Sequence, residues 1–266
     1  MILVDQVSAL MRRRQVLATL VQRDLRVRYA RSVLGYLWTI LDPLAMACVY
    51  FVVFTQILDA RDAGYDPYFL YLLTGLLAWQ WFSQCMTETS RALLSEARLV
   101  RSTNLPRELW VVRVVMAKGV EFLFSLPVLV AFTAYYMAVG ETQLHWGLVL
   151  FPVGIALQFL LMVGIGLVLA PITTLVTDTA RVVRIALRMG FYATPVLYSV
   201  DQAPEGLRVL LMLNPMTGIT EFYRAGLFSG QFNAVAMGVG AVISLVVLLI
   251  GVATFPRLEP AVLKEI

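Results

Sequence analysis

The run LVLFPVGIALQFLLMVGIGLVLAPITTLV, residues 148–176, contains no charged side chain at any of its 29 positions. A helix needs about 20 predominantly apolar residues to cross the hydrocarbon core of a bilayer, so this run is long enough to span a membrane. Pro152 and Pro171 lie inside the run and predict a helix that is tilted or bent. We therefore expect part of the folded chain to be surrounded by lipid rather than by water.

The whole chain has the same character. Of its 266 residues, 60% are hydrophobic and 14% are charged, whereas soluble domains average about 45–50% and about 25%. One water-soluble core cannot bury this excess, which excludes an ordinary cytosolic enzyme. We expect an all-α integral membrane protein with six transmembrane helices, near residues 35–58, 68–88, 119–139, 148–170, 182–200 and 234–255. The fifth of these is the weakest, because Arg184 and Arg188 must reach an interface or face protein.

Lysine and arginine are distributed very unevenly between the segments that connect these spans. Eighteen of the 21 cations fall in residues 1–34, 89–118, 171–188 and 256–266. The other three fall in residues 59–67, 140–147 and 201–233. Loops rich in lysine and arginine stay on the cytoplasmic side, so both termini are predicted to be cytoplasmic. This divides the chain into a cytoplasmic interface segment, residues 1–34, and a six-span domain, residues 35–266.

Two segments outside the spans also have a helical pattern. Residues 8–30 place Leu10, Leu17, Leu20, Val21 and Leu25 near one face, which predicts an amphipathic helix on the cytoplasmic surface. Residues 201–233 hold two apolar runs, 207–213 and 216–228, divided by Asn214-Pro215. Neither run is long enough to cross a bilayer, so we expect an external pair of short re-entrant helices between spans five and six.

Catalytic and metal-binding motifs are missing from the sequence. There is no phosphate-binding glycine loop, no zinc-protease motif, no serine-nucleophile motif and no Cys-x-x-Cys, and the chain has one histidine and two cysteines. We therefore expect neither an enzyme nor a metal site. Glu121 has two possible interpretations. An acid inside a membrane is costly to desolvate, which favours a functional role; alternatively, Glu121 lies near the cytoplasmic interface and pairs with Lys118 or Arg184. The second interpretation is favoured.

Aromatic residues recur on one face of two predicted spans. In the first, Tyr36, Tyr50 and Phe54 share a helical face with Ile40, Pro43 and Ala47, and in the second Trp79 and Phe82 share a face. Trp79 lies close to the middle of its span, where an interfacial aromatic belt does not explain it. Such rings offer flat apolar surfaces to sugar rings, although ordinary helix packing explains most aromatic stripes.

Several stretches, in order along nearly the whole chain, resemble the ABC-2 type polysaccharide exporter permeases. They are RDLRVRY (23–29), SVLGYLW (32–38), DPL (42–44), GLLAW (75–79) with Phe82, NLPRE (104–108), TDTAR (177–181), TPVLYS (194–199), LNPM (213–216) and EFYR (221–224). Each match alone is weak, but together they are specific. The number of arginines around the fifth span departs from the family pattern and affects either the contact with the ATPase or the contact with a lipid diphosphate.

This resemblance implies a permease of the bacterial plasma membrane that pairs with a second copy of itself. It also implies two nucleotide-binding ATPase subunits, so that ATP and Mg²⁺ belong to the partner and this chain holds no cofactor. The substrate implied is a polyprenyl-diphosphate-linked polysaccharide, and no nucleic acid is involved. The arginine-rich composition suggests a GC-rich genome and favours a galactan-like polymer.

Three groups of residues receive roles from these patterns. The substrate pathway is predicted to include Tyr36, Tyr50, Phe54, Trp79, Phe82, Tyr192 and Tyr198. The external gate is predicted to include Asn214, Pro215, Glu221, Tyr223 and Arg224. Coupling to the ATPase is predicted for residues 91–101, with Arg91, Glu96, Arg98, Leu99 and Arg101.

Other functions remain open at this point. A drug or small-lipid ABC-2 exporter would share the number of spans and the missing ATPase. A secondary carrier would need ionisable coupling groups in mid-membrane, and a membrane glycosyltransferase would need paired carboxylates, neither of which is evident. The re-entrant pair and the mid-span aromatics favour the polymer exporter.

Overall fold

A computed structural model describes residues 12–30, 32–57, 65–228 and 232–265, and every regular element in these residues is helical. The residues before Arg12, which include Leu10, lie outside the described part. The short elements are η1 (Gly35–Leu37), η2 (Val53–Ile57), α5 (Ala92–Ser95), α6 (Ala97–Ser102), η3 (Trp146–Leu150), η4 (Val200–Gln202), α10 (Glu205–Met212) and α11 (Pro215–Arg224). The longer helices are α2 (Arg14–Tyr29), α3 (Trp38–Val52), α4 (Tyr68–Thr89), α7 (Glu108–Val139), α8 (Phe151–Leu175), α9 (Thr179–Tyr192) and α12 (Ala234–Glu265).

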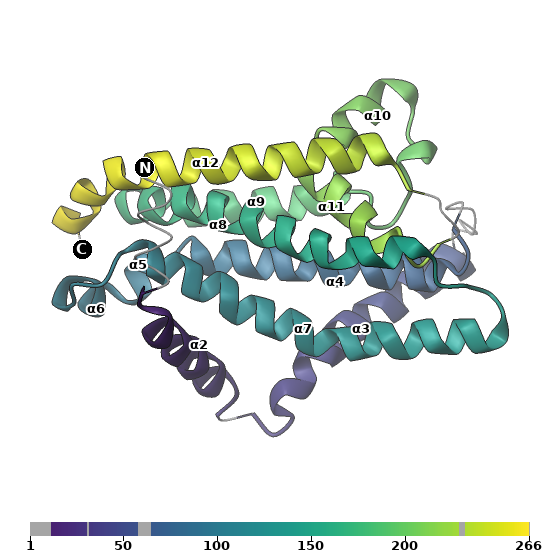
Figure 1. Cartoon of the computed structure of the whole chain (residues 1–266), viewed down its shortest axis with the longest axis horizontal. Coiled ribbons are helices and arrows are strands. Elements are labelled where there is room, and N and C mark those ends of the chain that lie inside the picture. The colour runs from purple at the N-terminus through teal and green to yellow at the C-terminus, as the bar shows by residue number, and fades with distance from the viewer. Residues whose placement is uncertain (1–11, 31, 58–64, 229–231, 266) are drawn as a thin grey trace.

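Four helices run lengthwise beside one another and give the molecule its long axis. These are α4, α7, α8 and α12, and α3 crosses them obliquely (Figure 1). At one end lie α2, α5, α6 and the last turns of α12, and we call this the basic end. At the opposite end lie α10 and the first turns of α12. Segments that the sequence analysis assigned to the cytoplasmic side therefore gather at one end of the bundle.

The chain is a membrane protein, and the residues that the structure describes include four helices long and apolar enough to span a bilayer. They cover Gly35–Val52, Glu108–Val139, Trp146–Leu175 and Ala234–Glu265. The second expected span corresponds to α4, which is buried along most of its length in the centre of the bundle. The fifth corresponds to α9, whose 14 residues extend about 21 Å at 1.5 Å per residue, less than the hydrocarbon thickness. Six spans and their orientation stay predictions.

Three expected boundaries differ from those of the structure. Helix α7 begins at Glu108 and so extends toward the N-terminus past residue 119, the limit expected for the third span, because Arg113 and Lys118 are neutralised by carboxylates and do not interrupt the helix. Helix α9 ends at Tyr192 rather than at residue 200, because Pro195 restricts the backbone that precedes it. Helix α12 continues past residue 255 to Glu265.

The predicted amphipathic helix is present as α2. Leu17, Val21 and Leu25 are buried and Leu20 is partly buried, and the helix packs against α7. Both runs of the segment 201–233 are helical, but their surroundings differ. Every described residue of α11 from Met216 to Arg224 is buried, whereas none of α10 is. Re-entry of this pair into a membrane stays a prediction.

A close approach of two backbones joins α8 to α12. A Cβ on Gly164 would lie 2.6 Å from the Cα of Leu248, and a Cβ on Gly251 would collide with the carbonyl oxygen of Gly164. Small residues at such crossings let membrane helices pack at short range, where van der Waals contact replaces the missing hydrophobic driving force. This crossing fixes the position of α12 on the bundle.

We expect Gly251→Ala to lower the stability of the chain by about 1–3 kcal/mol, the usual cost of forcing a methyl group into packed structure. Gly238→Ala is the matched control, because Gly238 lies on the same helix with nothing within 4 Å of an added Cβ. Thermal unfolding in detergent measures the difference. Equal melting temperatures for the two variants would contradict the role given to the crossing.

Candidate functional site

Charged residues of α2, α4 and α7 form ion pairs at the basic end. Arg28 binds Glu88 through two hydrogen bonds of 2.6 Å each, and its Nε lies 3.0 Å from Oε1 of Glu121. Lys118 Nζ lies 3.0 Å from Oε1 of Glu88 and 2.8 Å from Oε2 of Glu121. The predicted pairing of Glu121 with Lys118 is confirmed. Arg28, rather than Arg184, is its second cation.

A second cluster continues from the first toward α6. The nearly buried Arg113 places Nε 3.0 Å from Oδ2 of Asp24 and Nη1 3.0 Å from Oε1 of Glu96. Arg23 binds the same two carboxylates. Partial burial lowers the pKa of the Arg23 guanidinium, but the hydrogen bond to Glu96 and the attraction of both carboxylates outweigh it and raise that pKa, so Arg23 stays charged. We call the two clusters together the basic-end network.

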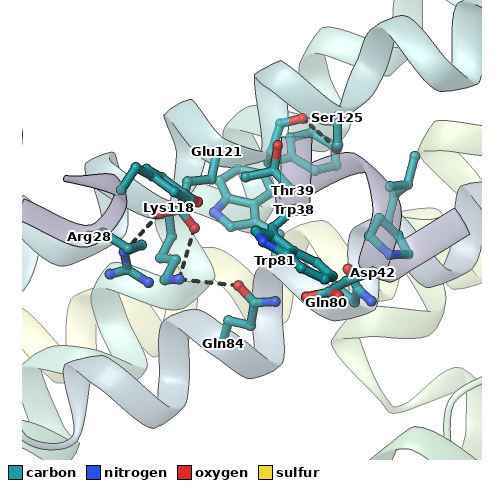
Figure 2. A pocket seen from close by; sticks show the side chains of 14 residues that line it. Arg28, Trp38, Thr39, Asp42, Gln80, Trp81, Gln84, Lys118, Glu121 and Ser125 are labelled. Carbon is teal, nitrogen blue, oxygen red and sulfur yellow. Dashed lines mark hydrogen bonds and ion pairs between the residues drawn. The ribbon is translucent and has the colours of Figure 1, made fainter. Parts of the chain in front are cut away.

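A polar cavity of about 240 Å³ lies between α2, α3, α4 and α7. Figure 2 shows Arg28, Lys118, Glu121 and Gln84 gathered at one side of it, with Gln84 accepting a 3.1 Å hydrogen bond from Lys118. Its other lining residues include Tyr29, Trp38, Thr39, Asp42, Gln80, Trp81, Phe122 and Ser125. Its cations are already paired with acids, so this cavity has no excess of positive charge.

A larger cavity of about 690 Å³ brings together three of the predicted pathway residues, Tyr50, Trp79 and Tyr192. The ring of Phe191 connects them, with its centroid 5.7 Å from that of Tyr50 and 5.9 Å from that of Trp79. Phe82 lies against Trp79 at 5.4 Å. Because arginines line the same space, we call it the arginine–aromatic cavity.

The other predicted pathway residues lie elsewhere. Tyr36 packs against Tyr29 and Phe124, with ring centroids at 4.3 and 5.4 Å. Phe54 packs against the hydrophobic core, and the hydroxyl of Tyr198 donates a 2.9 Å hydrogen bond to the carbonyl of Tyr192. The seven residues therefore do not form one continuous surface within a single chain.

Helix α9 contributes two arginines to the arginine–aromatic cavity. Arg184 and Arg188 both line it, and Arg184 also lines a neighbouring cavity of about 730 Å³ that borders the basic-end network. Among the described residues, neither guanidinium has an ion-pair or hydrogen-bond partner. Their charge is therefore not used in holding the fold together.

The predicted gate residues are tightly anchored. The Asn214 side chain caps α11 by accepting from Met216 N at 3.0 Å and donates to Thr194 Oγ1 at 2.8 Å, and Pro215 occupies the first helical position. Arg224 is fully buried, and its guanidinium donates to the carbonyls of Pro195, Tyr71 and Val196 while lying 3.4 Å from the centre of the Tyr71 ring.

Glu221 and Tyr223 are buried beside Arg224. A Glu221 oxygen accepts from Asn233 N at 2.9 Å, and the Tyr223 hydroxyl donates to Oε1 of Gln158 at 2.8 Å. Gln158 in turn donates to the Ala78 carbonyl of α4 at 2.8 Å. These contacts tie α11 to α4 and α8, so any movement of a gate must come from α10 or carry the neighbouring helices with it.

The predicted coupling segment is two short helices rather than one. Arg98 and Arg101 are exposed at the basic end and have no ion-pair partner among the residues that the structure describes. Leu99 packs against the core, and Glu96, between α5 and α6, belongs to the basic-end network. Arg91 is exposed and lines the neighbouring cavity. The segment thus has an outer cationic face and an inner face bound to α2 and α7.

Sequence reasoning missed Asp24, Arg28, Glu88 and Arg113 of the network, as well as Gln158. A signal existed for two of them. Arg113 stands alone in the apolar run 109–117, and Gln158 is the single amide in the run 148–176. Polar groups in such runs are costly to bury and usually have a partner. The partners themselves come from distant helices and are visible only in the structure.

Comparison with known proteins matches residues 15–228 to the family model described as ABC-2 type transporter. The O-antigen export system permease protein RfbA of Klebsiella pneumoniae is 29% identical over 92% of each chain. The protein of the same name in Myxococcus xanthus is 33% identical over 80% of each chain. The polysialic acid transport protein KpsM of Escherichia coli is 23% identical over 91% of this chain and 93% of its own.

We expect Arg113→Gln to destabilise the basic end, because it leaves Asp24 and Glu96 without their buried cation. Loss of one partner of a buried pair costs about 3–5 kcal/mol, and the partial exposure of these acids reduces that figure. Arg98→Gln, which removes an exposed arginine, serves as the control. Thermal unfolding of both variants is the measurement, and an unchanged melting temperature for Arg113→Gln would remove the network's structural role.

Proposed function

The chain belongs to the ABC-2 type transporter family, and we propose that it is the permease subunit of an ATP-driven exporter of a lipid-linked polysaccharide. The named relatives support the polymer class, since they are described as permeases or transport proteins for O-antigen and polysialic acid. A polyprenyl diphosphate is the carrier we propose. A cell-wall galactan is our candidate polymer on arginine-rich composition alone.

The arginine–aromatic cavity is the observation that carries this proposal. A polysaccharide is long, polar and hydrated, so burying its hydroxyls in lipid without partners is excluded by cost. The rings of Tyr50, Trp79 and Phe191 offer apolar faces, and the side chains of Ser83 and Thr87 offer polar groups in the same cavity. Sugar rings can stack on such faces and slide past them because no deep binding well holds them.

A second copy of the chain is proposed to complete the passage. The outward face of α9 exposes Val182, Ile185, Met189 and Tyr192, and α3 exposes Val49. Tyr192 also lines the arginine–aromatic cavity, so a copy packed against this face of α9 would border the cavity. Two copies facing each other would enclose a path, and the exposed α10 with its anchored neighbour α11 would form the outer gate.

Energy is proposed to come from two separate ATPase subunits that hold ATP and Mg²⁺. Residues 91–101 are placed to receive their movement, because Arg98 and Arg101 face outward and Glu96 is bonded to Arg23 and Arg113. The basic end would then be the cytoplasmic end, as the distribution of cations predicts. Movement of α6 would be passed to α2 and α7. The ion pair between Arg28 and Glu88 would then pass it from α2 to the wall of the cavity.

We expect Trp79→Leu with Phe82→Leu to reduce polymer export at least tenfold while membrane insertion survives. Leucine keeps much of the apolar volume but removes the flat rings. A host lacking its own copy of the gene is the test strain, and polysaccharide on its surface is the readout. Trp146→Leu, at an exposed tryptophan outside the cavity, is the matched control.

Two results would contradict the pathway or the function. Normal export by the double leucine variant would remove the aromatic pathway. A second result would favour a small molecule as the substrate. In that result, deleting the gene leaves the amount of surface polysaccharide unchanged but alters the sensitivity of the cells to drugs.

Charge reversal at Arg98 and Arg101 is expected to separate ATP hydrolysis from export. Both side chains are exposed, so the Glu variants should insert and fold normally, yet they would repel acidic partners on the ATPase. The expected result is at least tenfold less export with hydrolysis retained, compared with Arg257→Glu, an exposed control at the same end. Unchanged export in the double variant would show that the segment is a simple connector.

A further inference from the structure

The cavity of about 240 Å³ between α2, α3, α4 and α7, which we call the polar cavity, is lined by polar groups that the fold leaves without partners. The side chain of Trp81 is buried, and its indole Nε1 has no hydrogen-bond partner among the described residues. Within the same part of the chain, no hydrogen bond or ion pair reaches the Asp42 carboxylate or the side-chain amide of Gln80. Buried polar groups normally have a partner, so the unpaired donor of Trp81 in the cavity lining points to a ligand there.

The charge balance of the polar cavity favours a neutral ligand. Its lining has two cations, Arg28 and Lys118, and two acids, Asp42 and Glu121. Each cation is already bound to both Glu88 and Glu121, with nitrogen–oxygen distances of 2.6–3.0 Å. An anion in this cavity would therefore find no free cation, and the unpaired carboxylate of Asp42 would repel it.

Hydroxyl groups on a ring would satisfy the polar groups that remain. A hydroxyl can donate to the Asp42 carboxylate or accept from Nε1 of Trp81, and the amide of Gln80 can both donate and accept. Trp38, which lines the same cavity at the start of α3, is 46% exposed and offers a flat apolar face to the carbon–hydrogen groups of a sugar. Figure 2 shows both tryptophans between Gln80 and Asp42 on one side and the ion pairs on the other.

The volume and position of the polar cavity limit what it can hold. Pockets for drug-sized ligands measure about 300–1,000 Å³, so a cavity of about 240 Å³ takes a smaller ligand, such as a single sugar ring. The polar cavity and the arginine–aromatic cavity have Arg28, Gln84 and Lys118 in common. A sugar in the polar cavity would therefore lie directly beside the proposed path of the polymer.

We propose that the polar cavity binds one neutral sugar ring, with Asp42, Gln80 and Trp81 as its hydrogen-bond partners and Trp38 as its stacking surface. This inference rests on the proposed function in one respect, since it takes the ring to be a unit of the transported polymer. The polymer would then contain neutral sugars, because an acidic sugar would bring its carboxylate toward Asp42 with no free cation to bind it. The polar cavity would select the sugar, whereas the arginine–aromatic cavity would let the chain slide past.

The probes are methyl β-galactopyranoside and methyl β-glucopyranoside, and the protein is the full chain in phosphatidylcholine nanodiscs, which avoid the sugar heads of glycoside detergents. Titration followed by saturation-transfer NMR gives the affinity. We expect each of Gln80→Leu and Asp42→Asn to weaken binding of the better probe about tenfold, equal to about 1.4 kcal/mol. Ser83→Ala is the matched control and should stay within twofold, because Ser83 lies on the same helix as Gln80 and lines the arginine–aromatic cavity but not the polar cavity. Binding of neither probe, or an equal loss in all three variants, would overturn the proposal.

Two further ligands test the chemical class. Methyl β-glucuronide has the ring of the glucoside with one added carboxylate, and we expect it to bind at least tenfold more weakly than the glucoside. Equal or tighter binding of the glucuronide would overturn the assignment to a neutral sugar. Displacement of the sugar when phosphatidylethanolamine replaces phosphatidylcholine would show a site for a lipid headgroup and would also overturn the proposal.

Trp81→Phe guards against misfolding of the other variants. It keeps an aromatic ring against Phe122, whose centroid lies 4.6 Å from that of Trp81, and it removes the N–H donor. Weaker binding at an unchanged melting temperature supports the assignment, whereas unchanged affinity overturns it.

The binding assay uses neither polymer nor ATPase, so the site and the proposed function fail separately. A chain that binds the sugar in the polar cavity but does not affect surface polysaccharide would refute the proposed function and leave the sugar site standing. A chain that binds no sugar, in cells whose surface polysaccharide depends on the gene, would refute the sugar site alone.

Discussion

Cationic side chains at the edge of an apolar bundle must be neutralised or must reach water, and the fold of this chain is organised around that constraint. Arg23, Arg28, Arg113 and Lys118 are bound by four carboxylates from different segments of the chain at one end of the bundle. Arg224, deep in the other half, is held by three backbone carbonyls and an aromatic ring. Each of these two sets of contacts joins helices that are far apart in sequence. Together the contacts therefore determine where α2, α6 and α11 lie.

Four arginines of the coupling segment and of the cavity meet this constraint by exposure, with no ion-pair partner among the described residues. Arg98 and Arg101 face outward from the coupling segment, and Arg184 and Arg188 face a cavity. Between the two sets lies the basic-end network, which is continuous from Glu96 through Arg113 and Asp24 to α2, and from Arg28 on α2 to Glu88 at the cavity wall. An ATPase that pushed on α6 would therefore act on the cavity through ion pairs, which have discrete geometries, rather than through a flexible connector.

Much of the fold could be predicted from the sequence because lipid imposes a simple pattern. Among the described residues, the apolar runs located four helices long enough to span a bilayer, and the spacing of Leu17, Val21 and Leu25 located the buried face of α2. Asn214-Pro215 marked the start of α11 because asparagine caps a helix and proline fits its first position. The end of α9 was missed, since hydropathy alone gives little weight to Pro195.

The site was predicted less completely, and the reason is physical. Tyr50 and Trp79 were identified from periodicity and share a cavity with Tyr192, but Tyr36, which has the same sequence pattern as Tyr50, lies apart. Tyr223 and Arg224 were predicted as gate residues of a re-entrant helix pair, and they are buried anchors of α11. Pairings such as Arg28 with Glu88 depend on how helices cross, and one sequence does not carry that information.

The most direct test of the account is a cryo-electron microscopy map of this chain assembled with its ATPase and with a lipid-linked oligosaccharide. The account predicts two copies of the chain and sugar density against Trp79. Sugar density that passes along another face of the chain, away from Tyr50, Trp79 and Phe191, would contradict it.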